Sequence, residues 1–133
     1  MAEARSGESG ERHGCDQCWP PAADAAWDAR TALKQVEHLV DDSHFGVSIL
    51  VCLACRQQFV SVFLEEVDWV DGDDPQYWTM VPATEADVAD LVRQRNELSE
   101  ATFRSFAPTR QCLQRDCPKG TPCRAYWRTG IPV

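Results

Sequence analysis

The chain has 133 residues, a length that fits one domain with a hydrophobic core of its own. Its 21 acidic and 13 basic residues give a formal net charge of −8, which disfavours a phosphate backbone as the main partner. No apolar run approaches the roughly 20 residues of a membrane span, so no membrane partner is expected, and five Trp with five Phe exclude a wholly disordered chain.

The first 14 residues are rich in Gly, Ser and charged side chains, and we expect them to form a disordered tail. They contain no apolar stretch of the kind a secretory signal needs, so a cytoplasmic location is expected. Residues 15–133 are then expected to form a single domain.

A helix is predicted over residues 22–41. This segment is rich in alanine, which favours helix formation, and it ends at an Asp-Asp-Ser sequence. Its apolar residues recur at steps of three and four, which places them on one helical stripe. They are Ala26, Ala29, Leu33, Val36 and Val40.

Two strands are predicted on either side of the pair Cys52 and Cys55. Residues 45–53 alternate between apolar and other side chains, as a half-buried strand does. Residues 57–70 carry apolar side chains on both faces, which is typical of a central strand. These two strands are expected to form a hairpin whose turn contains the two cysteines.

The remaining elements complete an α+β prediction. Residues 77–81 are a short third strand that Pro82 ends, and residues 85–102 are a second helix with Thr84 as N-cap and Asp87 three residues later. The last segment, residues 110–133, is expected to form short strands around a Cys-Pro-Lys-Gly turn. The predicted fold is a small antiparallel sheet with two helices.

The strongest chemical signal is the two Cys-x-x-Cys pairs, Cys15 with Cys18 and Cys52 with Cys55. A two-residue gap lets both thiolates of a pair reach one ion, and two pairs supply the four tetrahedral ligands that zinc prefers. A thioredoxin-like redox motif is the alternative, but that motif needs a strand before it and a helix after it, and neither pair has both. Four thiolate ligands leave no open position, so one structural zinc ion is predicted.

The two pairs and the predicted hairpin resemble the zinc-ribbon class of folds. The resemblance covers about half the chain, and the helix predicted between the pairs departs from a plain ribbon. It implies a structural zinc-binding knuckle and carries no implication about a substrate.

Three further cysteines, Cys112, Cys117 and Cys123, are harder to interpret. The odd total of seven argues against a closed secreted disulfide framework. We expect them to be thiols packed near the core, because free cysteine behaves as a small hydrophobic residue. There are two alternatives for these three cysteines. They could form a second zinc site together with a histidine, or two of them could form a disulfide in an exported protein.

Charge is distributed unevenly along the chain. Residues 93–133 carry a formal charge of +5, against −13 for the first 92 residues. A basic face for nucleic acid is one interpretation, but we favour packing of this basic segment against the acidic body of the same molecule. The acidic residues 65–74 lack the order of an EF-hand loop and are interpreted as a solvated turn.

The sequence contains no nucleophile elbow, Walker A loop, dinucleotide fingerprint or His-Glu-x-x-His motif. A non-enzymatic adaptor with a structural zinc ion and another protein as partner is therefore our first hypothesis. The second is a thiol-redox or metal-handling protein that uses the C-terminal cysteines, and the third is a nucleic-acid-binding zinc ribbon.

Overall fold

The computed structural model describes residues 13–66, residue 70 and residues 74–132. Most of the predicted disordered tail over residues 1–14 lies outside this range. The end of the predicted strand 57–70 and much of the acidic turn do so as well.

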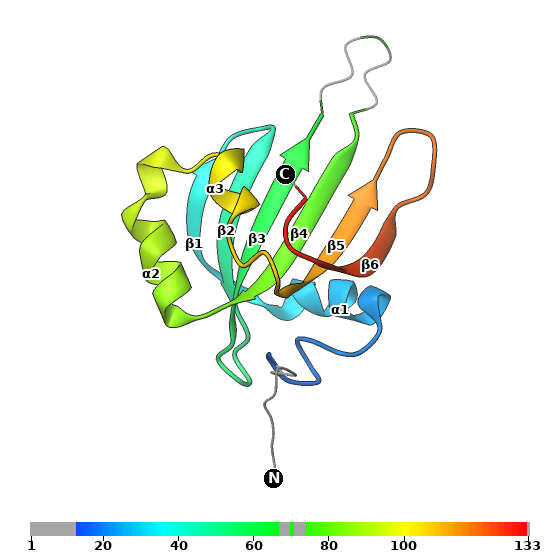
Figure 1. Ribbon diagram of the computed structural model, residues 1–133. Coiled ribbons are helices and arrows are strands. Elements are labelled where there is room, and N and C mark those ends of the chain that lie inside the picture. The colour runs from blue at the N-terminus through cyan, green and yellow to red at the C-terminus, as the bar shows by residue number, and fades with distance from the viewer. Residues whose placement is uncertain (1–12, 67–69, 71–73, 133) are drawn as a thin grey trace.

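One antiparallel sheet of six strands forms the centre of the molecule, and each strand pairs with the next along the chain (Figure 1). Its strands are β1 (Lys34–Asp41), β2 (Phe45–Val51), β3 (Gln58–Glu65), β4 (Gln76–Ala83), β5 (Gln111–Cys117) and β6 (Arg124–Thr129). The α+β prediction is confirmed, and β3 is a central strand as its two apolar faces indicated. The expected hairpin is also present, since β2 and β3 pair from Phe45 with Leu64 to Val51 with Gln58.

Helices cover both faces of the sheet (Figure 1). Helix α1 (Ala23–Ala29) and the 3₁₀ turn η2 (Arg30–Ala32) lie on one face. Helix α2 (Glu85–Arg93), the 3₁₀ turn η3 (Arg95–Glu97) and helix α3 (Glu100–Arg104) lie on the other. Among the described residues, no helix is long and apolar enough to cross a membrane.

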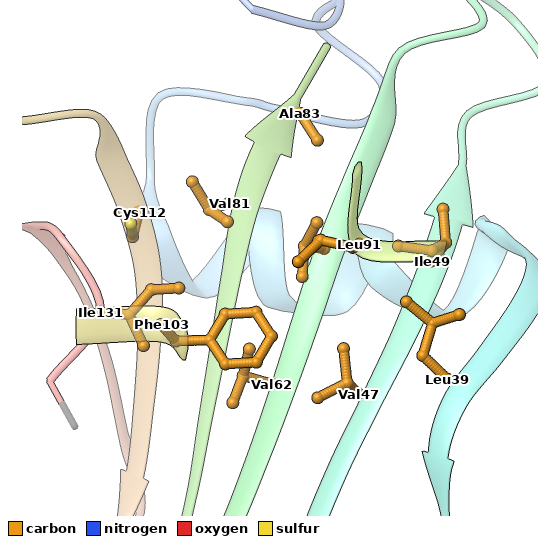
Figure 2. Close-up of a cluster of buried hydrophobic side chains, with 11 residues drawn as sticks. Leu39, Val47, Ile49, Val62, Val81, Ala83, Leu91, Phe103, Cys112 and Ile131 are labelled. Atoms are coloured by element: carbon orange, nitrogen blue, oxygen red, sulfur yellow. The ribbon is translucent and has the colours of Figure 1, made fainter. Parts of the chain in front are cut away.

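The core is divided between the two faces. Figure 2 shows the cluster on the face of α2 and α3, where Leu91 and Phe103 pack on the sheet. The buried residues of this cluster are Leu39, Val47, Ile49, Val60, Val62, Val81, Ala83, Leu91, Phe103, Cys112 and Ile131. A second cluster lies on the face of α1 and consists of Cys18, Ala26, Leu50, Cys52, Phe59, Met80 and Leu113. Two of the predicted metal ligands therefore belong to the core of the α1 face.

The predicted helix over residues 22–41 is wrong in its second half. The helical part ends with η2, and residues 34–41 form the edge strand β1. The pairing of β1 with β2 shifts register between Gln35 and Glu37 and again between His38 and Val40. Each irregularity inserts an extra residue, so the apolar positions lose the alternation of a strand and take on helix-like spacing.

The second predicted helix and the end of the third strand also need correction. Residues 85–102 form two helices rather than one, because Leu98 is extended and Ser99 caps a new helix with Thr102. Pro82 does not end the third strand but lies inside β4. It is tolerated there because β4 pairs with β5 only as far as Met80, so the missing N–H of Pro82 breaks no ladder bond on that side.

Candidate metal centre

The fold brings the two cysteine pairs together at one end of the sheet. Cys15 and Cys18 precede α1, whereas Cys52 and Cys55 lie in the turn between β2 and β3. The Sγ–Sγ distance is 3.8 Å within the first pair. Across the pairs it is 3.9 Å from Cys15 to Cys52 and 3.7 Å from Cys18 to Cys55. All four sulfur atoms lie within 4.8 Å of one another, so they could hold one metal ion.

The second knuckle is shaped by a tight turn at the end of β2. The Cys52 amide donates to the Gln57 carbonyl at 3.0 Å, and the Arg56 amide donates to the Cys52 carbonyl at 2.7 Å. Arg56 has a φ of 69°, in the left-handed region, which reverses the chain directly after Cys55. The turn thus brings the sulfurs of Cys52 and Cys55 to the same side.

The first knuckle has a similar backbone. The Trp19 amide donates to the Cys15 carbonyl at 2.8 Å, and the Cys15 amide donates to Cys18 Sγ at 3.2 Å. Gly14 precedes it with a φ of +72°, and a Cβ atom at this position would lie 2.7 Å from Cys18 Sγ. Only glycine therefore fits beside the sulfur in this conformation.

Gln57 connects the two knuckles. Its Oε1 accepts a hydrogen bond from the Gly14 amide at 3.2 Å, and its Nε2 donates to the Ala83 carbonyl at 3.0 Å. The segment before Cys15 is thereby attached to β4 through one side chain. The sequence prediction missed both residues, because it placed Gly14 in the disordered tail and gave Gln57 no role. The only available signal was a glycine directly before a Cys-x-x-Cys pair.

The thiols of the cluster have perturbed pKa values. Hydrogen bonds from the backbone amides of Cys18 and Gln17 lower the pKa of Cys15 to about 7. Burial raises the pKa of Cys18, and partial desolvation raises that of Cys55, which lies at the surface. A bound cation would favour the thiolate at every position, so the chemistry of these four donors fits a thiophilic metal ion.

The site is continuous with the core on the α1 face. Cys18 is 2% exposed and Cys52 5% exposed, and both pack with Leu50 and Phe59, while Cys55 faces solvent. Trp19 stacks on Phe59 with ring centroids 5.1 Å apart. Loss of the cluster would therefore disturb the apolar packing beneath it.

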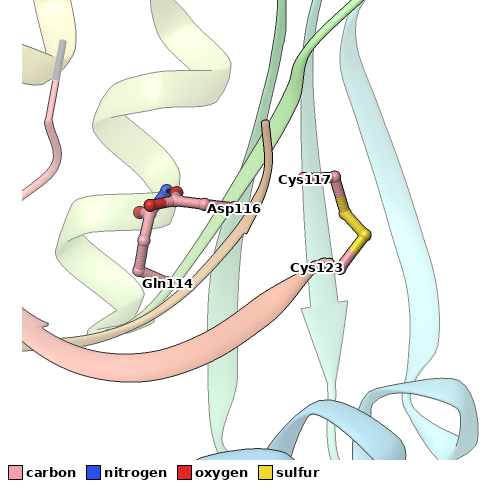
Figure 3. Close-up of a disulfide and its surroundings, with 4 residues drawn as sticks. All are labelled: Gln114, Asp116, Cys117 and Cys123. Carbon is pink, nitrogen blue, oxygen red and sulfur yellow. Dashed lines mark hydrogen bonds between the residues drawn. A yellow bond between two sulfur atoms is a disulfide. The ribbon is translucent and has the colours of Figure 1, made fainter. Parts of the chain in front are cut away.

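The other three cysteines take no part in this cluster. Cys117 and Cys123 form a disulfide between β5 and β6 (Figure 3), so the expectation of free thiols is wrong for these two. Their Cα atoms are 4.1 Å apart, because each cysteine is the chain neighbour of one member of the paired residues Asp116 and Arg124. Cys112 is a buried free thiol, as expected, and burial raises its pKa to about 11. The disulfide removes two of the three thiolates that the alternative second zinc site requires.

The basic C-terminal segment packs on the acidic body at two places, as the charge distribution indicated. Arg110 Nη1 lies 2.8 Å from a carboxylate oxygen of Asp87, and Arg95 lies 3.5 Å from Glu37.

Comparison of the sequence with known protein families, with curated proteins and with solved structures finds no match.

Proposed function

We propose that this chain is a small zinc-binding protein in which one zinc ion has a structural role. The observation that carries the proposal is the spacing of the sulfur atoms. A regular tetrahedron of thiolates around zinc, with Zn–S bonds of about 2.3 Å, has edges of about 3.8 Å. The three Sγ–Sγ distances given above, 3.7 to 3.9 Å, agree with those edges. Four thiolate donors favour zinc over calcium or magnesium, which prefer oxygen ligands.

The arrangement supports a structural role rather than a catalytic one. Four protein ligands fill the tetrahedron and leave no position for a substrate or an activated water molecule. The two pairs come from segments 37 residues apart in sequence. An ion held by both would attach the segment that leads into α1 to the β2–β3 hairpin.

Metal analysis of the reduced protein tests this proposal. We expect one zinc ion per chain, and we expect Cys18→Ser to lose it. Cys112→Ala is the matched control, because it removes a buried thiol outside the cluster and should leave the zinc content unchanged. An unchanged zinc content in Cys18→Ser would contradict the proposed ligand set.

We further propose that the protein acts as an adaptor with another protein as its partner. Support comes from the surface around the second knuckle, where Leu53 is 56% exposed. Beside the same turn is a groove of about 650 Å³ between the knuckle and the first turns of α2. Its walls combine apolar side chains such as Val51 and Val88 with the charged Arg56 and Glu85. Interface cores commonly combine such a buried apolar centre with a polar rim.

Site-specific crosslinking tests the adaptor role. A photoreactive amino acid at position 53 should give one discrete protein adduct in cells that express the full chain. The same amino acid at position 119, on the exposed β5–β6 loop, is the control and should not give that adduct. The adduct should disappear when Cys55→Ser is added. Absence of an adduct at position 53, or the same adducts at both positions, would contradict a partner at this surface.

A thiol-redox function is the second candidate, and the disulfide between Cys117 and Cys123 favours it. Cys112 does not suit this role, because its buried thiol has a raised pKa and reactive thiols have lowered ones. We retain the cytoplasmic location as part of the first proposal. It requires the two hairpin cysteines to be largely reduced in cells, since the cytosol keeps thiols reduced. Alkylation of intact cells followed by mass spectrometry distinguishes the two candidates.

A further inference from the structure

Arg30 is a cation on the α1 face whose hydrogen bonding is incomplete. Its Nη2 donates to the hydroxyl of the buried Ser61 at 2.9 Å. Its Nε is buried and has no hydrogen-bond partner. Burial lowers the pKa of this guanidinium, and no carboxylate from the described part of the chain pairs with it. An unsatisfied buried donor on a charged group is costly and requires an explanation.

A second arginine lies close to the first. The Cζ of Arg115 is 4.7 Å from the centre of the Trp27 ring and 5.7 Å from that of Trp78. The Cζ of Arg30 is 5.1 Å from the same Trp27 ring. The two guanidinium carbons are therefore at most about 10 Å apart, and their charges repel one another unless an anion neutralises them.

Neither guanidinium is neutralised within residues 13–66, 70 and 74–132, although the chain has 21 acidic residues. Arg95 and Arg110, by contrast, form ion pairs with Glu37 and Asp87. Trp27, Trp78 and Arg115 are only half-buried. A ligand from solvent can therefore reach the Arg115 side of the cluster.

We propose that Arg30 and Arg115 form a binding site for a phosphate group carried by a small molecule, with the buried Ser61 hydroxyl holding the Arg30 guanidinium in place. Two guanidinium groups match the double negative charge of a phosphate, and their fork of N–H donors matches its oxygen atoms. The indole rings pack against the guanidinium groups and hold them in place. Because the rings are engaged in this way, the site recognises the charged group itself. The net charge of −8 opposes a long polyanion such as nucleic acid.

Titration of the metal-loaded full chain with inorganic phosphate tests the site, with tryptophan fluorescence and calorimetry as readouts. We expect saturable binding that weakens with ionic strength, and a loss of affinity of about tenfold or more in Arg115→Gln. Arg124→Gln is the matched control. Its guanidinium also lies over an aromatic ring, that of Tyr126, but on the opposite face of the sheet, and this variant should bind as the parent does.

Arg30→Met provides a second test that does not depend on measuring weak binding. Without phosphate, this variant should melt at a higher temperature than the parent, because an unpaired buried charge is replaced by an apolar chain of similar length. With phosphate, the parent should gain thermal stability and the variant should not. A variant that melts lower in both conditions, together with a parent that does not respond to phosphate, would overturn the proposal.

Two further ligands identify the source of the phosphate group. If a nucleoside monophosphate binds with the same affinity as inorganic phosphate, the site recognises the phosphate group alone. If it binds more tightly, the rest of the molecule also contributes to binding. Both results support the site. Binding of a single-stranded oligonucleotide without any binding of inorganic phosphate would contradict it and favour a nucleic-acid surface instead.

Discussion

At the scale of single residues, Gly14 has the most demanding position in the metal cluster. Its φ is +72°, and a Cβ atom at this position would lie only 2.7 Å from Cys18 Sγ. We expect Gly14→Ala to displace that sulfur and to lower metal affinity, because the ligand geometry of a tetrahedral site is narrow. Competition with a chromogenic zinc chelator measures the effect.

Gly120→Ala is the control for this prediction. Gly120 has a φ of +81°, and a Cβ atom there would meet nothing within 4 Å. This variant carries the backbone strain of a left-handed alanine, about 1 kcal/mol, without any contact with the cluster. Equal chelator sensitivity in the two variants would show that the space beside Cys18 has no role in metal binding.

The sequence allowed the four cysteines to be predicted but not the residues that support them. The spacing of Cys15 from Cys18 and of Cys52 from Cys55 is a local feature with a chemical meaning. The contact between Gly14 and Gln57 joins positions 43 residues apart, so it exists only once β3 has paired with its neighbours. The juxtaposition of Arg30 and Arg115 could not be predicted for the same reason, because both contact Trp27 only once the chain has folded.

At the scale of elements, the capping of α2 makes a testable contribution to stability. Thr84 Oγ1 accepts from the Asp87 amide at 3.0 Å, and Asp87 Oδ2 accepts from the Thr84 amide at 2.9 Å. Arg110 Nη1 donates to the same Asp87 oxygen at 2.8 Å. We expect Asp87→Ala to lower the free energy of unfolding by about 1 kcal/mol at neutral pH, measured by urea denaturation. Glu85→Ala, in the same turn but outside this network, should cost less than about 0.5 kcal/mol.

The effect of Asp87→Ala should depend on pH. Burial alone would raise the pKa of Asp87, but hydrogen bonds from Thr84 and Arg110 outweigh it and hold the pKa below its usual 3.8. A carboxyl group with a lowered pKa stabilises the fold above its unfolded-state value and loses that contribution as the pH falls through the folded-state value. The difference between parent and variant should therefore be full at pH 7 and shrink below pH 3.8. A difference that stays constant would argue against an ionised Asp87 in the cap.

Elements with regular patterns were predictable, and those with irregular ones were not. The alternation in residues 45–53 located β2, and Thr84 located the start of α2. Strand β1 escaped prediction because its two register shifts remove the period of two by which a strand is identified. The prediction that Pro82 ends a strand was wrong for a related reason. A proline ends a strand only if its missing N–H faces a paired neighbouring strand, and that pairing is a property of the whole sheet.

The disulfide of the β5–β6 hairpin should stabilise the fold without affecting the metal centre. Cys117 and Cys123 are six residues apart in sequence, so the bond closes a short loop. A crosslink that closes such a loop restricts the unfolded chain and raises the free energy of unfolding by about 2 kcal/mol. Replacement of both cysteines by serine should lower the melting temperature while the zinc content stays at that of the parent. A loss of zinc in this variant would show that the hairpin and the cluster are coupled.

At the scale of the whole molecule, the sheet separates two apolar clusters that should respond differently to metal removal. The cluster on the α1 face includes Cys18 and Cys52, whereas the cluster on the face of α2 and α3 includes no residue of the metal centre. We expect chelation to increase hydrogen exchange in residues 13–33 and in the β2–β3 turn. Helix α2 should retain its protection, because Leu91 packs in the cluster on the other face of the sheet, away from the ion. Uniform loss of protection would instead indicate that the zinc ion is required for the entire fold.

Zinc and protons should compete for the sulfur atoms of the cluster. Metal binding requires thiolates, so each thiol that is protonated in the metal-free chain must release a proton on binding. The pKa values of Cys18 and Cys55 are raised above the ordinary 9.0, so both thiols hold their protons between pH 7 and 9. The pKa of Cys15 is about 7, so this thiol is about half ionised at pH 7 and almost fully ionised at pH 9.

Two or more protons are therefore displaced, and the apparent dissociation constant for zinc should rise by a factor of about a hundred or more for each unit that the pH falls from 9 to 7. Competition against a chelator of known protonation behaviour measures the slope of the logarithm of this dissociation constant against pH, which equals the number of protons displaced. Cys112→Ala should give the same slope, because its thiol lies outside the cluster. A slope of one proton or fewer would mean that Cys18 or Cys55 is already ionised before the metal arrives, and that the fold itself stabilises the thiolate.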